Sequence, residues 1–307
     1  MRPELAVVIV SYNSELDLDD CLDSVAAIED LVVEVAVVDN FSTDDSVAVA
    51  RKRESATVQV LVNEENVGFG RAVNQGVAAT TAPLVLLLNP DATLTPGSAE
   101  TLVRLSQDRP SHGLYGGLTR LSDGTLNEHT LRKLPSLLGT VMFGLGLAAV
   151  HPRLAVEKLD LPTDLTAVPM VTASLLLIDR TVWDELDGFD ERFFMYYEDA
   201  DLCRRAVDQG YVPLVDPDAI VRHDGGASSP DTGRKIAMMM AGRSTYIRTH
   251  WSGLPRWLAL AALNCGVGLR AAIDRARGKQ VWTTAWSLRS WWFPGYSVGS
   301  AAVPPAR

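Results

Sequence analysis

The first hundred residues alternate short apolar runs with amphipathic stretches, and this alternation limits the possible folds more than any other feature. The apolar runs are typical of strands buried on both faces, and they cover Leu5–Val10, Val33–Val38, Val58–Val62 and Leu84–Leu88. The stretches between them have helical spacing and predict helices over 16–27, from about 42 to 53 and over 70–79, with another beginning near Pro96. The pattern predicts an α/β fold with a mainly parallel sheet and helices on both faces.

The second half of the sequence is less regular. Short strands are predicted over 174–178, 212–215 and 220–222, and helices over 181–186 and 198–209. An apolar segment over 136–150 is expected either to shape an acceptor channel or to fill the core.

Composition restricts the function. The chain has 307 residues and a net charge of −10, so nonspecific binding of nucleic acid phosphates is not expected. Its three cysteines are widely spaced and predict neither a disulfide framework nor a metal cluster, which fits a reducing compartment. The sequence enters a strand-like run almost at once, and it predicts no secretory signal and no obligatory membrane span.

Residues 251–307 differ from the rest of the chain. They contain seven basic residues, one acidic residue and six of the seven tryptophans. The change predicts a domain over 1–250 and a helical appendage over 251–307. Aromatic and basic side chains suit a membrane surface, and the apolar stretch 257–269 is too short to span a bilayer but fits an interfacial helix. The alternative is a helix packed on the domain or on a second subunit, as in a homo-oligomer.

Polar groups follow each of the four predicted strands. They are Ser11-Tyr12-Asn13-Ser14, Asp39-Asn40, Asn66 to Arg71, and Asn89-Pro90-Asp91. Ligands of open parallel sheets bind at the carboxyl ends of the strands, so these groups predict one binding edge. Each group alone fits an ordinary turn.

Asp91 is a candidate ligand for Mg²⁺ or Mn²⁺ beside a diphosphate, because hard cations share carboxylate and phosphate oxygens. An Asx-type turn at Pro90 is the alternative. The sequence lacks the glycine patterns of dehydrogenases and phosphate-loop ATPases, so both classes are poorly supported.

A cluster of acids opens the helix predicted at residue 198. Glu198 and Asp199 point about 100° apart on a helix, so one of them is expected to act as a general base. Favourable interaction with the helix dipole is the alternative. His223 is a candidate second metal ligand or a structural histidine, and Arg204 reaches a diphosphate or is solvated.

Taken in order, these motifs resemble the family-2 inverting glycosyltransferases with the GT-A fold. The motifs are Val7 to Asn13, Val38-Asp39-Asn40, Asn66-x-Gly68-Phe69-Gly70 with Asn74, Asn89-Pro90-Asp91, Gly188 to Leu202, and His223-Asp224-x-Gly226-x-Ser228. The resemblance covers about residues 5–250.

The resemblance implies a role for each matching residue. Asp39 and the Tyr12 loop would contact the nucleobase and ribose, and Asp199 would be the catalytic base, with Glu198 beside it. Asp91 matches the last acid of the family's Asp-x-Asp motif. The first acid of that motif is replaced by Asn89 here, so the metal would be bound by Asp91 and His223. The donor-binding residues would be Ser11, Tyr12, Asn13, Asp39, Asn66, Gly68, Arg71, Asn74, Asn89 and Arg204.

Within the family, the sequence is most similar to rhamnosyltransferases. That likeness implies dTDP-L-rhamnose as donor, a polyprenyl-diphosphate-linked N-acetylglucosamine as acceptor, and a peripheral place on the cytoplasmic face of the cell membrane. The product would belong to the linker between peptidoglycan and arabinogalactan. The alternatives are another sugar donor in polysaccharide or O-antigen synthesis, a non-catalytic nucleotide-sugar-binding module, and a sugar-phosphate nucleotidyltransferase.

Overall fold

The computed structural model describes residues 2–128, 130–147, 159–223 and 232–297. Within these ranges one sheet has the strand order β3-β2-β1-β4-β8-β6-β9-β5, with β7 paired to β9. The strands are β1 Leu5–Ser11, β2 Val33–Asp39, β3 Val58–Val62, β4 Leu84–Leu88, β5 Thr93–Leu94, β6 Leu114–Arg120, β7 Thr166–Ala167, β8 Leu175–Asp179 and β9 Leu214–Arg222. The helices of the sheet region are α1 Leu18–Ala26, α2 Ser46–Lys52, α3 Phe69–Ala78, α4 Ser98–Asp108, the 3₁₀ turn η1 Pro110–His112, α7 Arg180–Glu185 and α8 Glu198–Asp208.

The predicted parallel half of the sheet is confirmed. Strands β3, β2, β1 and β4 are neighbours and all run parallel. The register pairs Ser11 at the end of β1 with Asp39 at the end of β2. The polar groups that follow the four strands therefore lie at one edge, as the alternation in the sequence predicts.

The other half of the sheet is mixed. Strand β8 runs antiparallel to both β4 and β6, while β6 and β9 are parallel. The two short strands predicted over 212–215 and 220–222 are wrong, because one strand, β9, runs through both. Pro217 lies inside β9, and a register irregularity in the β6–β9 pairing lies between Gly116 and Leu118, so the strand continues past the proline.

The helix predicted to have Ser42 or Thr43 as its N-cap begins later, at Ser46, with Asp45 as its N-cap. Ser42 is used elsewhere, because its hydroxyl accepts a hydrogen bond from the amide of Asn13 at 2.9 Å. A contact 29 residues away in sequence therefore decides where this helix starts.

Alternate residues of β1 face two separate cores. Ala6, Val8 and Val10 pack with α3, α7 and α8, whereas Leu5, Val7 and Ile9 pack with α1, α2 and α4. Both faces of the sheet are covered, which explains the continuous apolar runs in the sequence.

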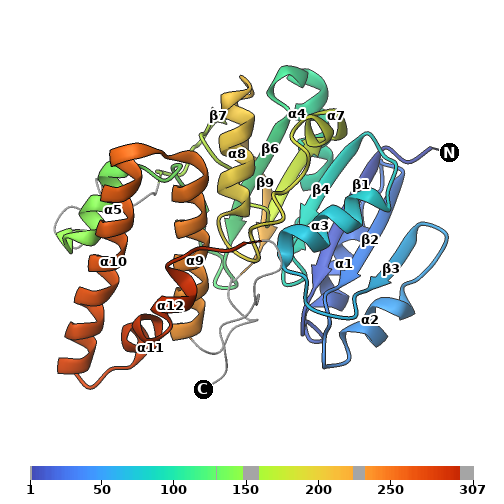
Figure 1. Cartoon of the computed structure of the whole chain (residues 1–307). Coiled ribbons are helices and arrows are strands. Elements are labelled where there is room, and N and C mark those ends of the chain that lie inside the picture. Colours follow the sequence, from blue (N-terminus) through green and yellow to red (C-terminus); the bar gives the residue numbers. More distant parts are fainter. Residues whose placement is uncertain (1, 129, 148–158, 224–231, 298–307) are drawn as a thin grey trace.

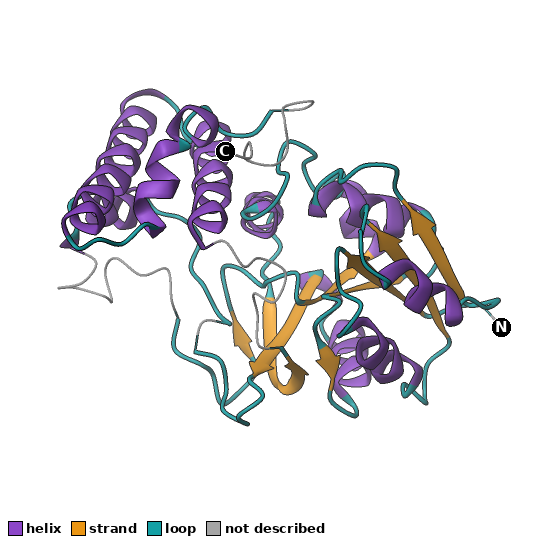
Figure 2. Cartoon of the chain, turned by 90° about the horizontal axis from the view of Figure 1, so that it is seen from below, coloured by secondary structure: helices purple, strands orange, loops and turns teal. Residues whose placement is uncertain are grey.

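A separate group of helices stands at one end of the molecule (Figures 1 and 2). It contains α5 Leu137–Gly144, α9 Thr232–His250, α10 Gly253–Ala276, α11 Val281–Ser287 and α12 Arg289–Trp292. These helices share a third core, built around the fully buried Trp292. Among the described helices, α10 alone is long and apolar enough to cross a membrane, and that test rests only on length and composition.

The carboxylate of Asp201 connects the sheet region to this helical group. Asp201 on α8 is fully buried and lies 2.7 Å from a guanidinium nitrogen of Arg205 and 2.8 Å from Nε2 of His250 on α9. Arg205 also donates to the carbonyl oxygen of Gly188 at 2.9 Å. One buried acid therefore fixes α8, α9 and the turn that opens the 188–197 loop.

We expect Asp201→Asn to lower the free energy of unfolding by about 3 kcal/mol, because it leaves the Arg205 charge without its buried partner. The matched control is Asp208→Asn, which removes an exposed pair with Arg204 on the same helix and should cost less than about 1 kcal/mol. Urea denaturation of both variants measures the difference. Equal losses in the two variants would contradict a special role for the buried network.

Candidate functional site

Within the described part of the chain, two buried polar atoms at the edge of the sheet have no hydrogen-bond partner. They are Oγ of Ser11 and Oδ1 of Asp39, on side chains that are at most 1% exposed. The other carboxylate oxygen of Asp39 accepts from the amide of Ser42 at 2.9 Å. Buried polar atoms are nearly always paired in folded proteins, so these two are suited to receive groups of a ligand.

Asn13 fastens two of the loops around this position. Its side-chain oxygen accepts from the amide of Thr43 at 2.8 Å, and its own backbone has a positive φ of 52°. The neighbouring Tyr12 is half-buried in the same loop. The loops after β1 and β2 are thus held as one unit before any ligand binds.

The loop after β3 is held by Asn40. The Asn40 side chain donates to Oδ1 of Asn66 at 2.9 Å and accepts from the amide of Val67 at 3.0 Å. The same oxygen of Asn66 accepts from the amide of Gly68 at 3.0 Å. The amide group of Asn66 therefore positions its own loop, and a contact between Asn66 and the donor stays a prediction.

Gly68 brings the loop after β3 against the acidic segment. It has a φ of 90°, and a Cβ atom there would lie 2.6 Å from the carbonyl oxygen of Phe194. The next amide, of Phe69, donates to that same oxygen at 2.8 Å. Only glycine fits this close approach.

Two residues of α3 also contact the acidic segment. The Asn74 side chain donates to the carbonyl oxygen of Phe189 at 2.9 Å and accepts from the amide of Phe189 at 3.0 Å. Arg71 forms an exposed ion pair with Glu191 at 3.1 Å. The structure gives both side chains a positioning role. Whether they also touch a donor stays a prediction, as it does for Arg204, which pairs with Asp208.

Asp91 and His223 are brought together from strands far apart in sequence. Asp91 lies just beyond β4 and His223 just beyond β9, and Nε2 of His223 is 2.9 Å from Oδ1 of Asp91. Asn89 lies 3.4 Å from the same imidazole nitrogen. The pairing predicted from the sequence is thus present as a contact. Residues 224–228 of the motif lie outside the described residues.

This pair fits a divalent cation that takes further ligands from its substrate. A carboxylate and an imidazole suit Mn²⁺, and the carboxylate also suits Mg²⁺. Across the described residues, no three or more His, Cys, Asp or Glu side chains gather in a metal-binding cluster. The remaining ligands would have to be phosphate oxygens or water, as is usual for magnesium at diphosphates.

Asp17 is an acid that the sequence analysis missed. It precedes α1, and its pKa is raised by burial and then by the negative charge of Asp91. The two carboxylates are therefore near enough to interact. An acid before a helix is ordinary in a sequence, so no local signal identifies Asp17.

Glu198 and Asp199 begin α8 in different electrostatic states. Burial, followed by the charge of Asp199, raises the pKa of Glu198 to about 8. Burial also raises the pKa of Asp199, while the amide of Ala200 and the charge of Arg132 act to lower it. The raised pKa of Glu198 favours its protonated form, so Asp199 is the better candidate of the two to carry a negative charge.

The sheet places Asp199 on the same edge as Asp91. The last residue of β4, Leu88, pairs with the first residue of β8, Leu175. Asp91 follows that pairing by three residues, and Ala173, whose backbone bonds Asp199, precedes it by two. Both carboxylates thus flank one end of the β4–β8 pair.

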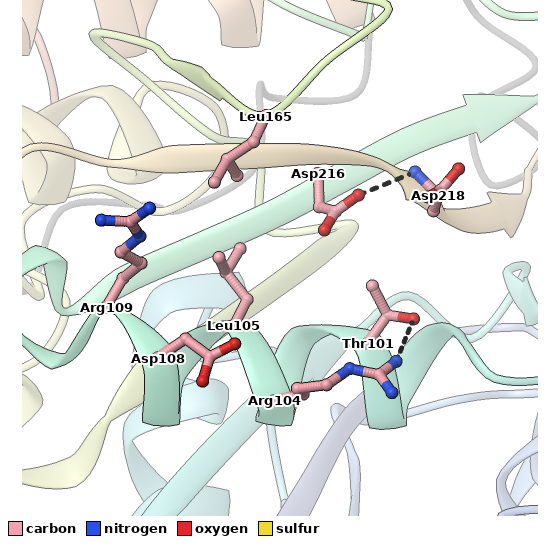
Figure 3. Close-up of a pocket in the computed structure, with 8 residues that line it drawn as sticks. All are labelled: Thr101, Arg104, Leu105, Asp108, Arg109, Leu165, Asp216 and Asp218. Carbon is pink, nitrogen blue, oxygen red and sulfur yellow. Dashed lines mark hydrogen bonds between the residues drawn. The ribbon is translucent and has the colours of Figure 1, made fainter.

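A separate groove of about 550 Å³ lies away from these residues (Figure 3). It lies between α4 and the first half of β9, and its side chains include Arg104, Asp108 and Asp216. His223 follows the opposite end of β9. We do not assign the substrate site to this groove. The unpaired oxygens of Ser11 and Asp39 and the Asp91–His223 pair lie elsewhere.

Known proteins match both the sequence and the fold. The family model described as Glycosyl transferase family 2 matches residues 6–162. The N-acetylglucosaminyl-diphospho-decaprenol L-rhamnosyltransferase of Mycobacterium tuberculosis H37Rv is 31% identical over 306 residues, covering 92% of this chain and 98% of that protein. Rhamnosyltransferase WbbL of Escherichia coli K12 is 25% identical over 230 residues, covering 71% of this chain and 84% of its own length.

Solved structures confirm the fold. The mannosyltransferase PcManGT from Pyrobaculum calidifontis, in complex with GDP-Man and Mn²⁺, aligns with a TM-score of 0.59 and 18% identity, over 94% of this chain and 80% of that chain. S. aureus TarS 1–349 aligns with a TM-score of 0.53 and 17% identity, over 94% and 91%. The family match and the 31% identical relative agree with the sheet described above: the chain belongs to glycosyl transferase family 2 and is a glycosyltransferase with the GT-A fold.

Proposed function

We propose that the protein transfers L-rhamnose from dTDP-L-rhamnose to a polyprenyl-diphosphate-linked N-acetylglucosamine, with inversion at the anomeric carbon. The observation that carries the proposal is the common edge formed by the Asp91–His223 pair and Asp199. The identity to the mycobacterial rhamnosyltransferase extends over 92% of the chain, so it includes the helical group as well as the sheet. That breadth supports a shared acceptor as well as a shared donor.

In the proposed reaction, the donor lies along the ends of β1, β2 and β4. Ser11 and Asp39 offer their unpaired oxygens to the nucleoside, and Asp91 and His223 face the diphosphate. A divalent cation bound by that pair would supply Lewis-acid stabilisation of the departing diphosphate. Asp199 accepts the proton of the acceptor hydroxyl while the hydroxyl oxygen attacks the anomeric carbon. Burial raises the pKa of Glu198 and so favours its protonated form, which makes Asp199 the better candidate for this role.

A panel of nucleotide sugars tests the proposed donor. The full-length protein, Mn²⁺ and the lipid-linked acceptor would be incubated with dTDP-L-rhamnose, GDP-mannose, UDP-glucose and UDP-galactose, and the glycosylated lipid would be measured. Product from dTDP-L-rhamnose alone is the expected result. Product from another donor would replace rhamnose and leave the family assignment intact.

We expect Asp199→Asn to lower turnover by roughly 10²–10⁴-fold, the usual contribution of a general base, while donor binding is retained. Glu198→Gln mimics the protonated carboxyl and should lower turnover by less than about ten-fold. Steady-state kinetics measures the first quantity and calorimetric titration with dTDP the second. Near-normal turnover in Asp199→Asn, or the larger loss in Glu198→Gln, would exclude Asp199 as the base.

We expect Asp91→Ala to weaken the Mn²⁺-dependent binding of dTDP by at least about 10–100-fold. Replacing a residue that only hydrogen-bonds to a metal ligand already lowers metal affinity by that factor, and Asp91 would bind the metal directly. Asp108→Ala in the remote groove is the matched control and should bind normally. Calorimetry with Mn²⁺ and with EDTA separates the metal-dependent part of the affinity. An unchanged ratio of the two affinities in Asp91→Ala would remove it from the metal site.

A lipid-linked acceptor requires contact with the bilayer, and the helical group has an exposed apolar face. We use the name apolar face for the exposed apolar side chains of α5, its C-cap residue and α10, of which the most exposed are Leu138, Leu145, Leu254 and Trp257, at 58–70%. The two helices pack tightly, because a Cβ on Gly144 would lie 2.5 Å from the carbonyl oxygen of Ala262. Apolar side chains favour insertion at the membrane interface, and the arginines of α10 favour contact with anionic lipid. Together they support a peripheral position on the cytoplasmic face of the membrane.

We expect Trp257→Asp to reduce binding to vesicles that contain anionic lipid, because it places a charge in the apolar face. Val62→Asp is the matched control, since Val62 is 45% exposed on β3 at the opposite end of the molecule. Vesicle flotation measures the bound fraction of each variant. Equal flotation of Trp257→Asp and the wild type would place the membrane contact elsewhere.

A further inference from the structure

Two arginines lie side by side at the ends of β6 and β9. Arg120 is the last residue of β6, Arg222 is the last residue of β9, and the parallel register pairs them directly. Paired residues of neighbouring strands project to the same face of a sheet. Leu118, two residues before Arg120, packs in the same core as Ala200 and Leu202 of α8. The two arginines therefore project on the face that α8 covers.

Neither arginine has a counter-charge among the described residues, where no carboxylate forms an ion pair with Arg120 or Arg222. Nε of Arg120 is buried and has no hydrogen-bond acceptor within the ranges that the structure describes. Like charges placed directly opposite each other on two strands are destabilising, and a buried donor without a partner adds to that cost. Judged from the described residues, the arrangement is unfavourable without a ligand, and a ligand that pairs with these groups would remove the penalty.

The arginine pair adjoins the site already described. The amide of His223 donates to the carbonyl oxygen of Arg120 at 3.0 Å, and the same His223 lies 2.9 Å from Asp91. A third basic side chain, Arg132, is near enough to Asp199 to lower the pKa of that carboxyl. The segment that carries Arg132 is tied to β6, because the amide of Thr119 donates to Oγ1 of Thr130 at 3.3 Å. Basic side chains therefore occur next to the candidate metal ligands and, separately, near the candidate base.

We propose that Arg120 and Arg222 form a binding site for the diphosphate group of a substrate. A guanidinium group binds phosphate oxygens through two parallel hydrogen bonds, so two neighbouring arginines match the paired charges of a diphosphate. The proposal depends on the proposed function only for the identity of the substrate. Two substrates would carry a diphosphate, the nucleotide-sugar donor and the lipid-linked acceptor.

Inorganic pyrophosphate tests the site without reference to any substrate. Calorimetric titration in EDTA, which removes binding by metal, would compare the wild type with Arg120→Gln and Arg222→Gln. Losing one charge-assisted contact should weaken pyrophosphate binding by about 10–100-fold. The matched control, Arg104→Gln, removes the same charge from the remote groove and should leave the affinity unchanged. Wild-type affinity in both test variants, or no binding to the wild type, would overturn the proposal.

Thermal unfolding without ligand gives an independent readout. A structural arginine would destabilise the protein when replaced, whereas the guanidinium group of Arg120 has no ion pair among the described residues, so Arg120→Gln should melt no lower than the wild type. Pyrophosphate should raise the melting temperature of the wild type more than that of the variant. If Arg120→Gln fails to fold, Arg120 is structural and its part of the proposal is wrong. The exposed Arg222→Gln then decides whether Arg222 binds pyrophosphate.

The source of the diphosphate is decided by comparing two acceptors. One is the polyprenyl-diphosphate N-acetylglucosamine, and the other is octyl N-acetylglucosaminide, which has no diphosphate. A KM raised in Arg120→Gln for the first acceptor alone assigns the site to the acceptor. Weaker dTDP binding, with a similar loss for both acceptors, assigns it to the donor. Unchanged values in every arm contradict a substrate site. If the wild type transfers no sugar to either acceptor, the proposed function fails while the pyrophosphate titrations still test the arginine pair.

Discussion

The buried carboxylate of Asp201 is the interaction on which the relation between the sheet and the helical group depends. It neutralises Arg205 and bonds His250, while Arg205 also holds the carbonyl oxygen of Gly188. These contacts fix where the 188–197 loop leaves the sheet and how α8 enters the site. Because a buried acid without its partners is strongly unfavourable, the arrangement is set as a unit. The direction of Asp199 at the start of α8 follows from it.

The polar groups at the sheet edge fall into two classes. Asn13, Asn40, Asn66 and Asn74 have their side chains bonded to loops, so they define the shape of the edge without needing a ligand. Ser11, Asp39 and Arg120 instead present buried atoms that have no hydrogen-bond partner among the described residues. Such atoms lower stability in the free protein. The first class has a structural role in the loops, while contact of either class with a substrate stays a prediction.

The sequence was sufficient to predict the parallel half of the sheet, because strands buried on both faces leave continuous apolar runs such as Leu84–Leu88. Asp91 and His223 were also predicted as candidate ligands of one metal from their places after predicted strands, and the family resemblance implied the same pair. The neighbouring arginines were not predicted. Their pairing depends on β9 continuing through Pro217 and on the register between β9 and β6. The local sequence around 212–222 instead predicts two short strands. Long-range register is not encoded in a local pattern.

Charge is distributed unevenly between residues 1–250 and residues 251–307. Residues 1–250 hold 21 basic and 37 acidic side chains, a net charge of −16, whereas residues 251–307 carry +6. Both proposed substrates and an anionic bilayer are negative, so most of the sheet region would be repelled by them. Attraction is left to the basic C-terminal segment, the arginine pair and a bound cation. If the proposed membrane contact holds, this asymmetry favours an approach with the helical group first. The lipid-linked diphosphate would then have few cationic positions available, and the arginines beside His223 are among them.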